Sequence, residues 1–156
     1  MLNWLKAQRA RRAIREARQE ALGACGPRPP RHLMSAITAT ATDLGPRLSR
    51  GELRPLRGQI ILILARQLAD ANERLRSSHW TGSDGHNVGR DVLQAYGLAL
   101  GVVRGSGSIE DLIDTLASQS TAYRDRVGDP DGYGSATLGE IERDLRHLSA
   151  QTVPGG

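Results

Sequence analysis

The 156-residue sequence predicts an all-α protein: a single helical bundle of about five helices with a basic N-terminal helical arm on a Pro-rich linker. Apolar residues recur at spacings of three and four in most segments between the Gly- and Pro-rich breaks. The chain has two Trp, three Tyr and no Phe, so the predicted core is aliphatic and rich in alanine. A strand-like alternation occurs only at 38–42, and no second strand exists to pair with it.

The first predicted helix covers residues 2–22, which are rich in Ala, Arg, Gln and Glu and contain no Gly or Pro. Small apolar residues form a narrow seam along it: Ala7, Ala10, Ile14, Ala17 and Ala21. Such a seam buries little area and is expected to hold only weakly against a core. Residues 23–30 end the helix with two glycines and continue as a stiff proline spacer.

Charge is distributed unevenly along the chain. Residues 1–31 hold eight basic and two acidic groups, a net +6, whereas residues 105–156 hold four basic and nine acidic groups, a net −5. We therefore predict three parts: a basic helical arm with its Gly/Pro linker at 1–31, a helical bundle domain at 32–150, and a disordered tail at 151–156.

The bundle is expected to begin with a short helix over 32–48, despite the alternating threonines within it. Ser49 and Glu52 have the spacing of a capping box, but Pro55 lies too deep for a helix that starts at Ser49. A start or kink near Pro55 resolves this, and the strongest helix then runs to Ser78. Its segment 60–64 is apolar on all sides, which predicts the middle of the core.

Three more helices complete the bundle. The first runs over 88–104, and the Gly97, Gly101 and Gly105 spacing predicts that another helix packs closely there. The second begins after the capping residue Ser108 and extends to about 127. The last presents a stripe of four apolar residues to the core: Leu138, Ile141, Leu145 and Leu148.

Several function classes are disfavoured by what the sequence lacks. No apolar run approaches the ~18 residues that a transmembrane helix needs. The single cysteine, Cys25, excludes an intramolecular disulfide framework and a multi-thiolate zinc site. There is no phosphate-cradling Walker loop and no nucleophile elbow. We therefore expect a cytoplasmic protein that is not an enzyme and holds no cofactor.

The basic arm is the leading candidate for function. Six side chains are its candidate contacts: Lys6, Arg9, Arg11, Arg12, Arg15 and Arg18. Guanidinium groups bind phosphate and carboxylate, so the expected partner is a nucleic acid backbone or an acidic protein surface. Alternatively, the helix is a solvated one that docks by its alanine seam on the bundle or on a second copy.

Two further interpretations of the arm stay open. A homo-oligomer forms if the arm of one copy docks on the acidic 105–156 region of another. Peripheral membrane contact is the other alternative, with Met1, Leu2, Trp4 and Leu5 at the surface and arginines at the lipid headgroups.

The segment 129–140 resembles an EF-hand calcium loop, with acids at positions one and three, glycine at six and glutamate at twelve. The resemblance implies Asp129, Asp131 and Glu140 as side-chain ligands of Ca²⁺. Position five, usually an oxygen ligand, is Tyr133. The alternative is an Asp/Gly turn that leads into the final helix.

A second loop, 78–87, contains His79, Asp84 and His86. Imidazole and carboxylate groups both suit Zn²⁺ or Fe²⁺, so these three residues are a candidate metal site. Alternatively, His79 ends its helix and Asp84 begins a turn.

Overall fold

The computed structural model describes residues 2–76, 88–127 and 132–152, and within these ranges it is all-helical. Six α-helices and one 3₁₀ turn follow one another along the chain: α1 (Leu2–Cys25), α2 (Arg31–Leu44), η1 (Arg54–Leu56), α3 (Arg57–Arg76), α4 (Val88–Gly105), α5 (Ile109–Val127) and α6 (Tyr133–Thr152). The prediction of an all-α fold is confirmed. None of the described helices is long and apolar enough to cross a bilayer.

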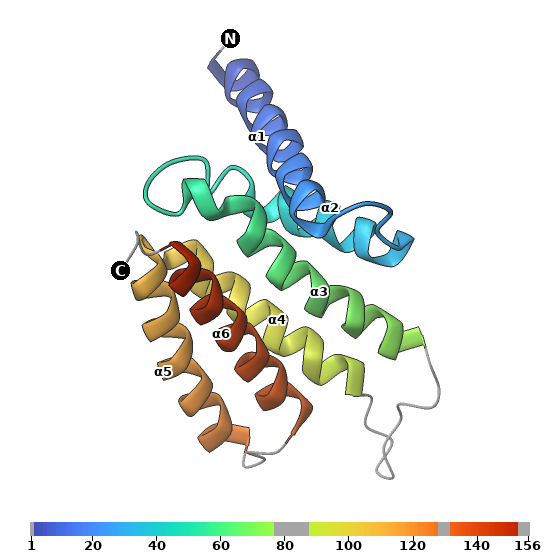
Figure 1. The fold of residues 1–156 in the computed structure, drawn as a ribbon, viewed down its shortest axis with the longest axis vertical. Coiled ribbons are helices and arrows are strands. Elements are labelled where there is room, and N and C mark those ends of the chain that lie inside the picture. Colours follow the sequence, from blue (N-terminus) through green and yellow to red (C-terminus); the bar gives the residue numbers. More distant parts are fainter. Residues whose placement is uncertain (1, 77–87, 128–131, 153–156) are drawn as a thin grey trace.

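Helix α3 is the centre of the molecule (Figure 1). It contacts α1 and α2 on one side and α4 and α6 on the other, while α5 packs against α4 and α6. The segment 60–64 is buried on every side of the helix, as its uninterrupted apolar sequence predicts. The apolar stripe of α6 is buried as well, so the aliphatic core extends from α1 to α6.

The alternating threonines of α2 are accommodated in a helix, which confirms the helical prediction for this segment. The hydroxyls of Thr38 and Thr42 donate hydrogen bonds to the backbone carbonyls of Met34 (3.0 Å) and Thr38 (2.8 Å), one turn earlier. Thr40 points inward, where its hydroxyl lies 2.9 Å from the buried hydroxyl of Tyr96 on α4. Each threonine thus has a polar partner compatible with helical backbone.

The helix starts follow the local chemistry of their first residues. The Ser49 hydroxyl donates to the carbonyl of Pro46 (2.6 Å) in a turn, and α3 begins at Arg57 after the η1 turn that contains Pro55. The expected start near Pro55 is therefore confirmed. At α5, the Asp111 amide donates to the Ser108 hydroxyl (3.1 Å), which confirms the predicted cap.

The predicted close packing at Gly97, Gly101 and Gly105 is wrong. A Cβ placed at any of them would have no neighbour within 4 Å in the described part of the chain. The close approach to α4 occurs instead at Gly89, where a Cβ would lie 2.8 Å from the Ala71 carbonyl oxygen of α3. Spacing alone does not say which face of a helix its neighbour occupies.

The observed ends of α1 and α6 differ from the predicted boundaries by two or three residues. Helix α6 continues to Thr152, so residues 151 and 152 of the predicted tail are helical. The first helix, predicted over 2–22, extends three residues further, to Cys25. It contacts both α2 and α3 across the proposed boundary at residue 31.

Candidate functional site

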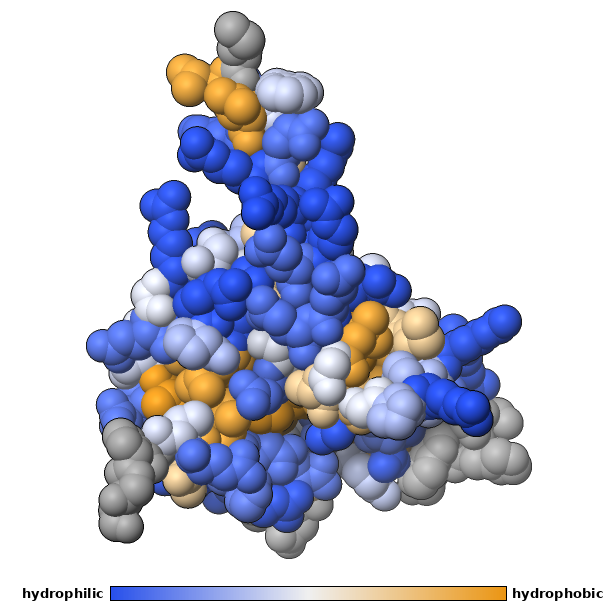
Figure 2. All heavy atoms as spheres, turned by 45° about the horizontal axis from the view of Figure 1, so that its top comes forward, coloured by the Kyte–Doolittle hydropathy of each residue, from blue (hydrophilic) through white to orange (hydrophobic). Residues whose placement is uncertain are grey.

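The two halves of α1 have different surroundings. Residues 2–12, the outer half, extend away from the other helices, whereas residues 13–25, the inner half, lie against α2 and α3 (Figures 1 and 2). In the outer half every side chain is exposed except that of Ala10, which is half-buried. In the inner half, Ala17 and Ala21 are fully buried.

The inner half approaches its neighbours at backbone distance. A Cβ on Gly58 of α3 would lie 2.7 Å from the Glu20 Cβ and 2.8 Å from its carbonyl carbon. A Cβ on Gly45, just after α2, would lie 3.1 Å from the Cα of Ile14. The two glycines therefore provide the space in which the alanine seam packs.

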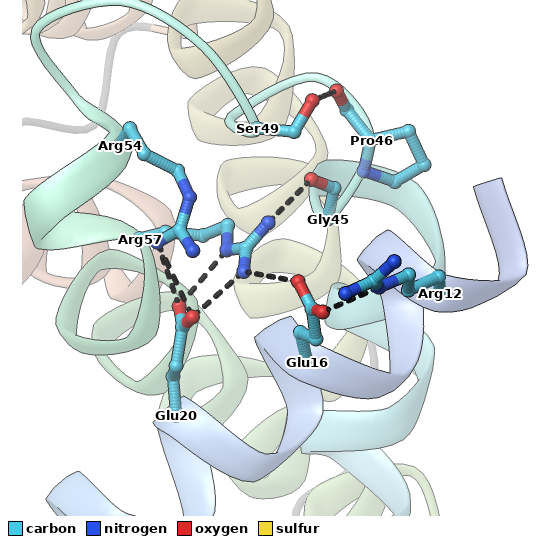
Figure 3. A network of polar contacts seen from close by, with 8 residues as sticks. All are labelled: Arg12, Glu16, Glu20, Gly45, Pro46, Ser49, Arg54 and Arg57. Atoms are coloured by element: carbon cyan, nitrogen blue, oxygen red, sulfur yellow. Dashed lines mark hydrogen bonds and ion pairs between the residues drawn. The ribbon is translucent and has the colours of Figure 1, made fainter. Parts of the chain in front are cut away.

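A buried guanidinium joins the inner half to α3. The side chain of Arg57 is 1% exposed, and it lies among α1, α3 and the residue that follows α2 (Figure 3). Its Nε and Nη2 donate hydrogen bonds to the two carboxylate oxygens of Glu20, at 2.9 and 2.7 Å. Its Nη1 donates to the carbonyl oxygen of Gly45 at 3.4 Å. This fork-to-carboxylate pairing is the strong geometry for such ions.

Two further charges surround this pair. Arg54 Nη1 lies 3.2 Å from Glu20 Oε2, and Glu16 Oε2 lies 3.9 Å from Arg57 Nη2. The hydrogen bond from Arg57 lowers the pKa of the Glu20 carboxyl, and this effect outweighs the partial burial that raises it. The only two acidic residues of α1 therefore face inward, toward α3 and η1.

The six predicted contact residues of α1 are not equivalent. Arg12 Nε pairs with Glu16 Oε1 (2.9 Å), and Arg18 Nε donates to the hydroxyl of Thr38 (2.9 Å) on α2. The other four make no ion pair or hydrogen bond with any described side chain: Lys6, Arg9, Arg11 and Arg15. All four are exposed, and we call them the unpaired basic cluster.

The unpaired basic cluster occupies two opposite sides of the helix rather than a single face. Successive residues of an α-helix are rotated by about 100°, so Lys6 and Arg9 point to one side of the helix while Arg11 and Arg15, four residues apart, point to the opposite side. No acidic residue precedes Glu16 in α1, so these directions are uniformly positive. The outer half can attract anions from both of these sides.

A hollow beside the inner half adds a basic residue that sequence reasoning did not select. It has a volume of about 440 Å³ and lies between α1 and α2, with five lining residues: Arg18, Arg31, Met34, Ser35 and Thr38. Arg31 was counted only in the overall charge of the arm. Its position becomes evident once α2 folds back along α1 and brings Arg31 to the same hollow as Arg18.

The Arg57 pair was also missed by the sequence analysis. The only available signal was that Glu16 and Glu20 stand four residues apart on an otherwise basic helix, hence on one face. Nothing near Arg57 in sequence distinguishes it from the other arginines, because its partner lies 37 positions away.

The calcium-loop residues are only partly within the described chain. Asp129 and Asp131 lie outside the described residues, and α6 already begins at Tyr133, the fifth loop position. Glu140, the twelfth, stands two turns into α6, where its Oε2 accepts a hydrogen bond from Gln67 Nε2 at 2.9 Å. Gly134 packs against the Tyr123 ring.

No cluster of three or more metal-ligating side chains occurs within the ranges 2–76, 88–127 and 132–152. The other candidate metal site, His79, Asp84 and His86, lies outside the described residues. Comparison of the chain with protein-family models, curated proteins and solved structures finds no match.

Proposed function

We propose that this protein is a non-enzymatic helical binding module, and that the outer part of α1 is the arm by which it attaches to a phosphate-bearing polyanion. The observation that carries this proposal is the unpaired basic cluster. Its four charges are exposed, while the two acids of the same helix have other partners: Glu20 pairs with Arg57 and Arg54, and Glu16 pairs with Arg12. The charge available to a partner is therefore positive along the whole outer half.

Arginine chemistry favours phosphate as the group that is bound. Three of the four cluster residues are arginines, whose planar forks match phosphate oxygens. Their arrangement around the helix does not match the single complementary patch that an acidic protein surface would present. Arg18 and Arg31, which share one hollow, provide a second place for a phosphate group close to the body.

Salt-dependent binding to a DNA duplex tests the electrostatic part of this proposal. Substituting Lys6, Arg9, Arg11 and Arg15 together by Gln should lower the magnitude of the salt slope by about 3.6, since each of the four phosphate contacts contributes about 0.9. Point substitutions are preferable to a deletion of the first 31 residues, because that deletion would also remove Ala17, Glu20 and Ala21 from the packed body.

A matched control changes the same charge elsewhere on the surface. Arg66, Arg76, Arg90 and Arg143 are exposed residues of α3, α4 and α6, and replacing all four by Gln alters the net charge equally. If both quadruple variants lose affinity to the same extent, the binding depends on net charge alone and the assignment to α1 is wrong. Light scattering on the same samples tests the alternative that copies self-associate, with the arm of one docked on the acidic 105–156 region of another.

A further inference from the structure

The outer end of α1 is apolar as well as exposed. The exposed fractions of Leu2, Trp4 and Leu5 are 76%, 62% and 44%. They account for three of the six large hydrophobic residues exposed in the described chain, and they lie within four consecutive positions. Figure 2 shows an orange, hydrophobic patch at the end of α1 that lies away from the body, above an otherwise blue helix surface. Water contact at this cluster is unfavourable unless a partner covers it.

The basic residues of α1 follow directly behind this apolar end. At 1.5 Å per residue, Lys6 to Arg12 occupy a band about 10 Å long, which begins one residue after Leu5. This band is comparable in depth to the polar headgroup layer of a bilayer, about 5 to 8 Å on each side. Long Lys and Arg side chains reach along such a layer while their charged groups stay hydrated.

The directions of these basic side chains favour a binding surface that the helix enters with its tip rather than one along which it lies. A helix lying along a nucleic acid groove contacts it with one face, which would leave part of the unpaired basic cluster unused. A helix that enters a layer of phosphates by its tip is surrounded by them, so charges on both sides are used. Tryptophan is also typical of the interface between lipid headgroups and acyl chains.

We propose that the outer end of α1 docks on an anionic lipid bilayer, with Leu2, Trp4 and Leu5 inserted among the lipids and the outer members of the unpaired basic cluster, Lys6, Arg9 and Arg11, bound to lipid phosphates. The inference rests on the proposed function and names the polyanion as a membrane surface. Two weak contributions act together here, since a small apolar anchor and a basic patch each bind membranes only marginally alone.

Vesicle binding separates the apolar contribution from the charges. The probes are vesicles of phosphatidylcholine with one quarter phosphatidylglycerol, vesicles of phosphatidylcholine alone, and a DNA duplex. Replacing Leu2, Trp4 and Leu5 together by Gln should weaken binding to the anionic vesicles at least tenfold. Affinity for the duplex should stay within twofold, because the charges are unchanged. Leu93→Gln, at a residue of α4 with 38% exposure, serves as control and should bind like wild type.

Fluorescence of Trp4 reports insertion directly. The chain has two tryptophans, Trp4 and Trp80, so Trp80→Phe leaves Trp4 as the only tryptophan, which excitation at long wavelength selects over the three tyrosines. Its emission should shift to shorter wavelength, and brominated acyl chains should quench it, with anionic vesicles. Neither change should occur with the duplex or with phosphatidylcholine alone.

The outcomes distinguish this inference from the proposed function. If the triple variant binds anionic vesicles within twofold of wild type, or if Trp4 emission does not shift on binding, insertion is wrong while polyanion binding stands. Binding of wild type to the duplex but not to vesicles overturns the membrane proposal in favour of nucleic acid. Failure to bind either probe at low salt overturns both proposals.

Discussion

The outer and inner halves of α1 share the alanine seam and its flanking arginines but have opposite surroundings. Ala7 and Ala10 continue the same seam as Ala17 and Ala21, and arginines alternate with the seam in both halves. Yet Ala17 and Ala21 are fully buried, whereas Ala7 is exposed. Helix propensity therefore explains why α1 forms but does not explain which half packs.

The difference between the halves comes from the residues that face them. Gly58 and Gly45 let the backbone of the inner half approach at contact distance, which compensates for the small area that alanine buries. Arg57 adds a buried ion pair with Glu20 at the same place. Among the residues that the structure describes, no such partner faces the outer half, so its charges and its apolar end stay available for binding.

The largest expected effect comes from removing Glu20. Glu20→Ala should reduce the free energy of unfolding by about 3 kcal/mol, the low end for a broken buried pair, because Glu20 itself is one-third exposed. Urea denaturation measures this change. Arg12→Ala breaks the exposed pair with Glu16 and should change stability by less than about 0.5 kcal/mol. Equal effects of the two variants would show that Arg57 does not anchor α1.

Identical substitutions at two positions of the seam compare the halves directly. Ala17→Leu should destabilise the fold by about 2 kcal/mol, since three extra carbon atoms must enter a fully packed site. Ala7→Leu should stay within about 0.5 kcal/mol, because Ala7 is exposed. Thermal unfolding monitored by circular dichroism provides both values. Tolerance of leucine at 17 would contradict tight packing of the inner half.

A third pair of variants examines the contact across the glycine. Gly58→Ala brings a Cβ within 3 Å of the Glu20 backbone and should cost about 1.5 kcal/mol, despite the better helix propensity of alanine. Gly23→Ala, where a Cβ has no neighbour within 4 Å, should instead stabilise the helix by up to about 1 kcal/mol. Stabilisation by both variants would mean that α1 and α3 can separate without penalty.

The smallest effect is the pH dependence of the Glu20 pair. The pKa of Glu20 is lowered in the folded state, so its contribution to stability is present above the ordinary glutamate value of 4.5 and is lost as pH falls. The stability difference between wild type and Glu20→Gln should therefore shrink below pH 4.5. Urea denaturation at pH 7 and pH 3 measures it, and a difference that grows in acid would contradict the assignment.

Much of the fold follows from local sequence. The breaks at Gly, Pro and Ser108 and the apolar periodicity predict where the helices lie, because propensity, capping and amphipathicity act within a few residues. The uninterrupted apolar run at 60–64 likewise marks the core. The prediction of close packing at Gly97, Gly101 and Gly105 was wrong because it concerned a tertiary contact. Local sequence does not determine which face of a helix its neighbour covers.

The candidate site likewise combines features that are evident from the sequence with features that depend on tertiary contacts. That residues 1–31 are strongly basic is evident from the sequence, and so is the apolar composition of residues 1–5. Which arginines are unpaired is only partly evident: Arg12 has Glu16 one helical turn away, whereas Arg18 and Arg57 each depend on a partner that folding brings from a distant segment.

By itself, the sequence determined that the chain is helical, roughly where each helix lies, and that positive charge concentrates near residue 1, because these properties depend on neighbours in the chain. The tertiary structure decided that α1 is half anchored and half projecting. The physical reason is that Arg57, Gly58 and Gly45 contact α1 within its inner half, residues 13–25, and this pairing of distant segments exists only in the folded molecule.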